Sequence, residues 1–320
     1  MKLVVVSDIH YAGPEEQRRR GYELRVIPNA ALRLAAAAWR RWIWLADPTA
    51  HNQRLEQLIA ANPDPDLVVA NGDFTVDSAF VGVSDDAALS SAGVCLDRLR
   101  GAYGPRLHAT IGDHELGKQS LFGGAGGLRL RSWERCRRDL GLEPVWRKDY
   151  GRWVMIGIAS TPVALPVFAP EVLPEERAGW ADVAGTLWDG IREVFCGIES
   201  GQRILLFVHD PSALPFLARE ASVARHLPQI ALTVVGHLHT PAIFRLGQTL
   251  AGMPRIGFLG NTIRRYSEAL REARCWRQFR TVVCPSPAGI QLLKDGGWIE
   301  MDLAVDGRDE VQVRRQRLPW

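Results

Sequence analysis

Five short clusters of acidic residues and histidines in this 320-residue chain could bind metal ions. In chain order they are Asp8-x-His10, Gly72-Asp73, Gly112-Asp113-His114-Glu115, the single His209, and Gly236-His237-x-His239. Five of the eight histidines fall inside them. Carboxylates and imidazoles without thiolates suit Mn, Fe, Zn or Co, and the set offers more donors than one tetrahedral ion would take. The donor set therefore predicts two metal ions.

The spacing inside two of the clusters brings potential ligands together in pairs. In an extended chain, residues separated by one position point to the same side. Asp8 with His10, and His237 with His239, could then each grip one ion. The glycine that begins three of the clusters would let the backbone turn sharply and approach a metal or substrate closely. A turn-capping role would explain one such cluster, but not five.

Apolar runs precede four of the clusters and predict buried strands. The runs are residues 3–6, 67–70, 204–208 and 232–235, and they are apolar throughout apart from Thr233. Uniform runs of this kind suit strands that are covered on both faces. Polar residues that follow such strands lie at their carboxyl ends, where α/β sheets assemble their sites. We therefore expect the clusters to meet at one edge of the sheets.

The remaining elements are predicted from periodicity and turn residues. Helical patterns cover residues 51–61, 87–99, 131–139 and 181–195. Further strands are predicted over 107–111, 154–159, 280–283, 289–293 and 298–303. Because no internal repeat or linker divides the chain, we expect one domain over residues 1–320.

Together the five clusters resemble the calcineurin-like metallophosphoesterases, whose pattern is D-x-H, G-D, G-N-H-[E/D], a lone His and G-H-x-H. All five blocks occur here in family order between residues 8 and 239. The resemblance implies an α/β fold, a four-layer αββα sandwich, with a binuclear metal centre that hydrolyses phosphate esters or anhydrides. Residues 14–50 would be a helical insertion near the N-terminus, forming a lid or an interfacial segment.

The resemblance also implies a role for each motif residue. One metal would be held by Asp8, His10, Asp73 and His239, and the other by Asp73, which bridges the two ions, with Asp113, His209 and His237. His114 would face the phosphate, where it stabilises developing charge or protonates the leaving oxygen, and Glu115 would orient His114 without itself binding a metal. A hydroxide that bridges the metals would attack phosphorus. The identity of the metals, Mn, Fe or Zn, stays open.

One motif residue departs from the family pattern, because Asp113 stands where the family has Asn. An Asn coordinates through its carbonyl and can donate its NH₂ to a phosphate, whereas an ionised Asp adds a charge and offers no donor. We expect tighter metal binding, weaker electrophilicity and less tolerance for dianionic substrates. Phosphodiester or pyrophosphate bonds are then favoured over phosphomonoesters. A catalytically weak metal-binding scaffold is the alternative.

The segment between the first two clusters is unusually rich in arginine and tryptophan. Within residues 31–45 these are Arg33, Trp39, Arg40, Arg41, Trp42 and Trp44. A helix of this length would measure about 22 Å, too short to span a bilayer. Residues 30–46 could pack as a lid, or they could lie in a membrane interface as a peripheral contact. The second reading favours a lipid-linked pyrophosphate or phosphodiester, similar to the substrates of the UDP-2,3-diacylglucosamine pyrophosphatases.

The charge and cysteine content of the chain indicate what kind of partner it binds and in which compartment it is found. Lys and Arg number 39 against 36 Asp and Glu, and no basic, aromatic-interleaved module follows the motifs, so a nucleic-acid partner is not expected. The expected partner is a phosphate-containing small molecule or lipid. The five cysteines are scattered without a C-x-x-C pair, which argues against a disulfide framework. With no signal-peptide core at the start of the chain, we expect a cytoplasmic protein, with membrane association as the alternative.

Overall fold

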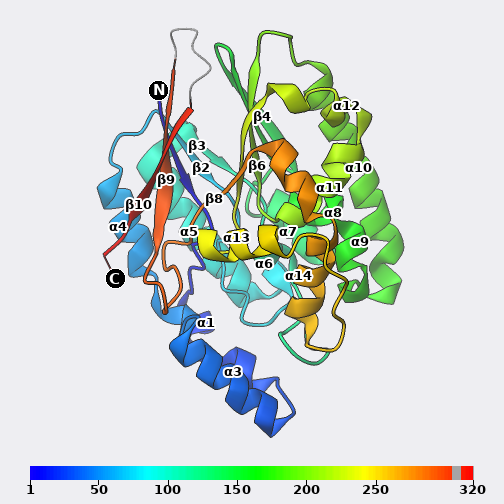
Figure 1. Cartoon of the computed structure of the whole chain (residues 1–320). Coiled ribbons are helices and arrows are strands. Elements are labelled where there is room, and N and C mark those ends of the chain that lie inside the picture. The colour runs from blue at the N-terminus through cyan, green and yellow to red at the C-terminus, as the bar shows by residue number, and fades with distance from the viewer. Residues whose placement is uncertain (305–310, 320) are drawn as a thin grey trace.

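Two five-stranded sheets form the centre of the computed structural model, which describes residues 1–304 and 311–319 (Figure 1). The first sheet has the order β10-β9-β1-β2-β3, with β1 Lys2–Val6, β2 Leu67–Ala70, β3 Leu107–Ala109, β9 Gly297–Leu303 and β10 Val311–Arg317. The second has the order β4-β5-β6-β7-β8, with β4 Val145–Tyr150, β5 Trp153–Ile158, β6 Arg203–Val208, β7 Ile230–Val235 and β8 Thr281–Val283. Strands β1 to β3 pair in parallel, as do β5 to β8, whereas β4, β9 and β10 pair antiparallel.

Alternate residues of the buried strands face two different layers. Leu3 and Val5 of β1 join Phe207 of the other sheet in one apolar cluster, which fills the space between the sheets. Val4 belongs to a second cluster that includes helix residues such as Leu96. This is why the strands read as uniformly apolar runs, since both faces are covered. The predicted α/β sandwich of two sheets flanked by helices is confirmed.

Helices cover the outer faces of the sheets (Figure 1). Their bounds are α1 Pro14–Arg18, α2 Tyr22–Arg25, α3 Ala30–Trp42, α4 Gln53–Ala61, α5 Asp86–Tyr103, α6 Asp113–Leu116, α7 Leu130–Arg138, α8 Ser160–Val163, α9 Leu165–Phe168, α10 Arg177–Cys196, α11 Leu214–Arg219, α12 Ala221–Ala224, α13 Pro241–Thr249 and α14 Asn261–Arg271. Side-chain caps define several of the starts. The Asp85 carboxylate accepts from the backbone N–H of Ala88 at the start of α5, as N-cap residues typically do.

One predicted strand is wrong, because residues 289–293 form a turn. Gly289 has a φ of +62°, and the Asp295 carboxylate accepts from the N–H of Ile290 across this turn. The carbonyl of Ile290 accepts from Lys294, and the N–H groups of Gln291 and Leu292 donate to the carbonyls of Trp44 and Ile43 after α3, so the backbone of this segment does not pair with a sheet. The strand predicted over 107–111 ends at Ala109. Strands β4 and β10 and helices α13 and α14 were not predicted.

The segment between β1 and β2 contributes helices α1 to α4, with α3 at one end of the molecule (Figure 1). Asn29 caps α3 by accepting from the N–H groups of Ala31 and Leu32. An ion pair between Arg40 of α3 and Glu23 of α2 ties the two helices together. In residues 1–304 and 311–319, no helix combines the length and the apolar character that crossing a membrane requires.

Candidate metal centre

The five motif clusters meet where the parallel strands of both sheets end. Each cluster follows a strand directly, or lies on the short helix α6 in the case of the third cluster. The structure groups their ligand atoms into three overlapping sets, and within each set all atoms lie within 4.8 Å of one another. The sets are Asp73, Asp113, His209 and His237; Asp8, His10 and His239; and His10, Asp73 and His114. Residues more than 200 positions apart in the chain are thus brought together.

The backbone that presents these residues is not extended, which corrects the reasoning from pair spacing. Asp8, His10, Asp73, His237 and His239 have φ angles between 50° and 60°, in the left-handed region. This conformation is uncommon for residues with a side chain and costs about 1–2 kcal/mol per residue. Such strain clusters at functional sites, where the surrounding structure holds it in place. The ligand pairs therefore converge through tight turns, not through strand geometry.

Asp73 lies at the centre of the site. Its Oδ2 is 3.2 Å from His209 Nε2 and 3.8 Å from both His10 Nε2 and His114 Nε2. The carboxylate belongs to two of the three sets of ligand atoms. Its Oδ1 accepts from the backbone N–H of His114 at 2.9 Å. One oxygen is thus occupied by the backbone, and the other is directed at imidazoles from both sides of the site.

Three histidines are held so that Nε2 faces the centre. Nδ1 of His209 donates to the carbonyl of Asn71 at 2.6 Å, and Nδ1 of His114 donates to the carbonyl of Val76 at 2.7 Å. Nδ1 of His10 lies 3.2 Å from the carbonyl of Thr75. Outer hydrogen bonds of this kind fix the tautomer and ring orientation of metal-binding histidines. Nε2 is then free to act as a ligand atom.

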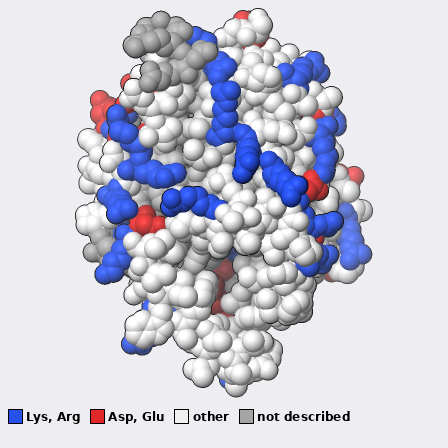
Figure 2. Space-filling view, in the orientation of Figure 1, with Lys and Arg blue, Asp and Glu red and all other residues white. Residues whose placement is uncertain are grey.

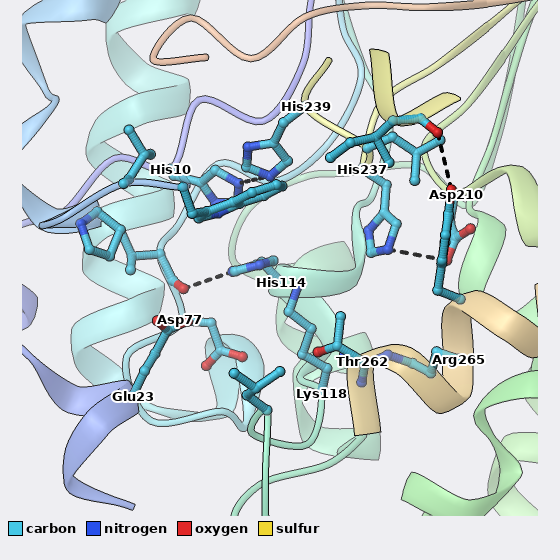
Figure 3. A pocket seen from close by; sticks show the side chains of 18 of the residues that line it. His10, Glu23, Asp77, His114, Lys118, Asp210, His237, His239, Thr262 and Arg265 are labelled. Atoms are coloured by element: carbon cyan, nitrogen blue, oxygen red, sulfur yellow. Dashed lines mark hydrogen bonds and ion pairs between the residues drawn. The ribbon is translucent and has the colours of Figure 1, made fainter. Parts of the chain in front are cut away.

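The donors fit divalent cations. Asp8 Oδ1 is buried, has no hydrogen-bond partner among the described residues, and lies 3.4 Å from His239 Nε2. His239 Nε2 is also 3.2 Å from His10 Nε2 (Figure 3). Two nitrogens and an unpaired buried carboxylate oxygen directed at one another are costly unless a cation neutralises them. This arrangement supports metal binding on the side of Asp8.

The electrostatics of the site favour positive charge next to the carboxylates. Burial lowers the pKa of His114 and of His239 well below the usual value, which keeps both imidazoles neutral and able to coordinate. Burial also acts to lower the pKa of His209, but the charges of Asp73 and Asp8 outweigh it and raise this pKa. The same acidic surroundings would attract metal cations.

Glu115 supports Asp73 rather than His114. Its Oε2 accepts from the backbone N–H groups of Asp73 and Gly112, both at 2.9 Å. Its Oε1 accepts from those of Phe74 and Thr75 at 2.7 and 3.3 Å. Burial, with the nearby Asp73 charge, raises the pKa of Glu115 to about 7. Glu115 therefore joins the turn after β2 to α6, and the carbonyl of Val76 orients the His114 ring.

Two glycines are required by close packing at the centre. A Cβ on Gly72 would lie 2.7 Å from the Cα of Gly112 and 2.8 Å from His209 Nδ1, and Gly72 also has a φ of +89°. A Cβ on Gly236 would lie 2.0 Å from Ser7 Oγ and 2.7 Å from Asp8 Oδ2. The expected close approach of backbone at these positions is therefore present.

A cavity of about 470 Å³ opens beside the ligand residues (Figure 3). His10, His114, His237 and His239 form part of its wall, and the rest comes mainly from α2, α3, α13, α14 and the loop after α6. The apolar part of the lining includes Tyr22, Trp39, Trp44, Phe80, Leu121, Ile243, Leu246, Ile263 and Tyr266. The Trp44 ring lies 4.9 Å from the His239 ring, centroid to centroid. The cavity thus joins a polar centre to an apolar chamber.

Sequence reasoning missed two charged residues of this wall, Lys118 and Arg265. Lys118 lies on the loop after α6, and its Nζ is 2.9 Å from Asp113 Oδ2. Burial acts to lower the pKa of Lys118, but the carboxylate of Asp113 outweighs this and raises it, so the ammonium stays charged. Asp210 also lines the wall, and its Oδ2 lies 3.9 Å from His237 Nε2. No motif marks Lys118 in the sequence.

The comparisons with known proteins agree with this geometry. The family model for calcineurin-like phosphoesterases matches residues 1–241. No curated protein matches the chain. Among solved structures, a dimetal phosphatase from Danio rerio is similar with 12% identity and a TM-score of 0.50, over 98% of this chain and 95% of that one. This likeness concerns the fold.

Two further solved structures are similar at lower scores. The phosphopantetheinyl hydrolase from Mycobacterium tuberculosis has 17% identity and a TM-score of 0.36, over 75% of this chain and 83% of that one. A metallophosphoesterase from Sphaerobacter thermophilus has 12% identity and a TM-score of 0.35, over 98% and 87% of the two chains.

Proposed function

Because the chain belongs to the calcineurin-like phosphoesterase family, we propose that it is a phosphohydrolase with a binuclear metal centre. The observation that carries this proposal is the position of Asp73 Oδ2, which lies within 3.8 Å of imidazole nitrogens from two of the ligand sets. Two divalent cations bound there would lower the pKa of a shared water and polarise the phosphoryl oxygens. Mn, Fe and Zn all suit these donors.

The proposed roles follow the grouping of the side chains. One ion would be held by Asp8, His10 and His239, the other by Asp113, His209 and His237, with Asp73 shared. His114 lines the cavity, and its Nδ1 donates to a carbonyl, so Nε2 is the atom that would face the phosphate. It could protonate the leaving oxygen only from the doubly protonated ring. Glu115 would keep Asp73 in place through the backbone.

The proposal covers phosphodiester, pyrophosphate and phosphomonoester bonds. A preference for phosphodiester or pyrophosphate bonds over phosphomonoesters was expected from the additional carboxylate of Asp113 alone. Lys118 lies against that carboxylate and offsets its charge. A panel of bis(p-nitrophenyl) phosphate, p-nitrophenyl phosphate and a pyrophosphate ester would therefore rank the three bond types directly.

Removal of metal tests the function. We expect the purified protein with Mn²⁺ to hydrolyse bis(p-nitrophenyl) phosphate, and we expect EDTA to abolish the reaction because the donor set would be emptied. Adding back Mn²⁺, Fe²⁺ or Zn²⁺ should restore activity, as measured by release of p-nitrophenolate. Failure with every metal and every generic ester would favour the binding-scaffold alternative.

A second, finer candidate is a substrate that carries an apolar chain. The cavity supports it, because indole and aliphatic side chains surround the space next to the ligand histidines. The rings of Trp39 and Trp44 stack with 5.2 Å between their centroids. Trp39 lies on α3 and Trp44 in the turn after it, and both line this wall. A small hydrophilic phosphate ester would leave this apolar surface uncovered, whereas a hydrocarbon chain would bury it.

Exposed apolar residues, some of them on the helices α3 and α13 that line the cavity, extend the candidate to a membrane surface. They come from α3, α13 and two loops, with exposed fractions of 73% for Leu34, 66% for Trp42, 54% for Leu246, 85% for Phe258 and 62% for Leu292. Figure 2 shows a hollow with acidic residues inside, framed by uncharged residues and with Lys and Arg side chains above it. Apolar residues beside basic ones suit an anionic lipid interface. Under this second candidate, the protein would be cytoplasmic and would contact the membrane through residues 30–46.

Chain length and vesicle binding test the second candidate. We expect kcat/KM to rise at least about tenfold from ethyl to dodecyl p-nitrophenyl phosphate, because added methylenes enter the apolar chamber. The protein should sediment with phosphatidylserine-containing vesicles, and Leu34→Asp with Trp42→Asp should reduce this binding. Val94→Asp, at an apolar position on α5 that is 38% exposed, is the control. Equal rates for both esters together with no sedimentation would reject the candidate.

A further inference from the structure

The two carboxylate oxygens of Asp113 have different partners. Oδ1 faces the ligand histidines, at 2.9 Å from His237 Nδ1 and 3.2 Å from His209 Nε2. Oδ2 forms an ion pair with Lys118 Nζ at 2.9 Å. Asp113 is fully buried, and the Lys118 side chain is 19% exposed. The ion pair is therefore largely shielded from water, where a charge effect is strong.

The pair changes the charge of the centre. With Asn at position 113, the ligand set would contain two carboxylates, Asp8 and Asp73, with a charge of −2. With Asp113 it contains three, and Lys118 returns the sum to −2. The departure from the family pattern and the buried lysine therefore cancel.

The loop that carries Lys118 is held from the other side of the cavity. The N–H of Gln119 donates to Glu171 Oε2 at 2.7 Å. Glu171 is buried and is bound by Arg264 and Arg265 of α14, at 2.7 and 2.6 Å. Figure 3 shows Lys118 in the cavity together with His114 and Arg265. The ammonium is thus placed at the cavity wall before any substrate binds.

We propose that Asp113 and Lys118 act as one unit that replaces the family Asn, with Lys118 as a phosphate-binding and specificity residue. An ammonium has three N–H donors, and Asp113 takes one. The other donors are available to a substrate phosphate oxygen, a contact that the carboxylate itself could not make. The role of Lys118 in binding a substrate phosphate rests on the proposed function. The effect of the pair on metal affinity does not.

Two single variants and their combination test the proposal. We expect Lys118→Met to tighten Mn²⁺ binding, because a cation next to the ligands is lost, and Asp113→Asn to weaken it. Each shift should be about tenfold or more in Kd by titration calorimetry, within the 10–100-fold range for residues around a metal site. The double variant should return to within about threefold of the unmodified protein. A residue with a merely structural role would weaken Mn²⁺ binding in both single variants.

Kinetics test the phosphate contact separately. Lys118→Met should raise KM for bis(p-nitrophenyl) phosphate at least about tenfold, and the double variant should recover most of this loss, because Asn supplies a donor. Lys118→Arg should retain activity, and the exposed Lys148 on β4 provides a Lys148→Met control. Thermal melting of each variant shows that it folds. Shifts of Mn²⁺ affinity in the same direction, or an unchanged KM in Lys118→Met, would overturn the proposal.

If the unmodified protein binds Mn²⁺ but hydrolyses no ester, the proposed function fails while the calorimetric comparison still decides the charge compensation. The two failures are therefore distinguishable.

Discussion

Asp73→Asn is expected to lower kcat/KM for bis(p-nitrophenyl) phosphate by about 10³-fold. The amide has the shape of the carboxylate but no charge, and the oxygen it alters is the one directed at three imidazole nitrogens. Loss of a single preorganised electrostatic group at a reacting centre typically costs 10²–10³-fold, and Asp73 would serve both metal sites. Activity and bound Mn²⁺ per chain, by elemental analysis, should fall together.

The matched control for this variant is Asp182→Asn on α10, an exposed position of the same residue type. It should keep both activity and metal content. A variant of Asp73 that retains two metals per chain and more than about a tenth of the activity would contradict a shared ligand at this position.

Glu115→Ala should be the most destabilising of the substitutions considered. The carboxylate is fully buried and accepts from four backbone N–H groups, including that of Asp73. Each buried donor left without a partner costs about 1–3 kcal/mol, so we expect a loss of at least about 3 kcal/mol in the free energy of unfolding. Urea denaturation measures it.

Two further variants serve as controls for Glu115→Ala. Glu193→Ala, at an exposed position on α10, should change stability by less than about 0.5 kcal/mol. Glu115→Gln keeps the side-chain length and one acceptor oxygen, so its loss should be intermediate. Equal stability of Glu115→Ala and the unmodified protein would show that the turn after β2 does not depend on this side chain.

Much of the ligand set could be predicted because its residues follow strands whose apolar runs are easy to recognise. Residues 3–6 and 67–70 are buried on both faces, and in such a sheet the next polar residue must lie at the edge. The roles of the individual ligands stay predictions. The assumed extended pairing at Asp8 and His10 was wrong, because the turns depend on contacts between loops, such as the N–H of Asp8 donating to the carbonyl of Gly72.

Lys118 and the cavity could not be predicted for a different reason. Lys118 lies between Gly117 and Gln119, a context that also suits a solvated loop. Its pairing depends on the turn that ends α6 and on Glu171, which is more than 50 residues away. Strand β10, with three arginines among its seven residues at the edge of a sheet, similarly lacks a strong local signal. Long-range contacts of this type are not encoded in periodicity.

The site draws its ligands from turns after β1 and β2 in one sheet and after β6 and β7 in the other. Any ion held between them would bind both sheets at once, adding to the apolar contact of their inner faces and to hydrogen bonds such as that of His209 with the carbonyl of Asn71. A ligand that binds only the native state stabilises it, and does so more strongly as its affinity and concentration rise. With the ion bound to both sheets, we expect the two sheets to unfold together. The metal centre would in this way also increase the cooperativity of unfolding.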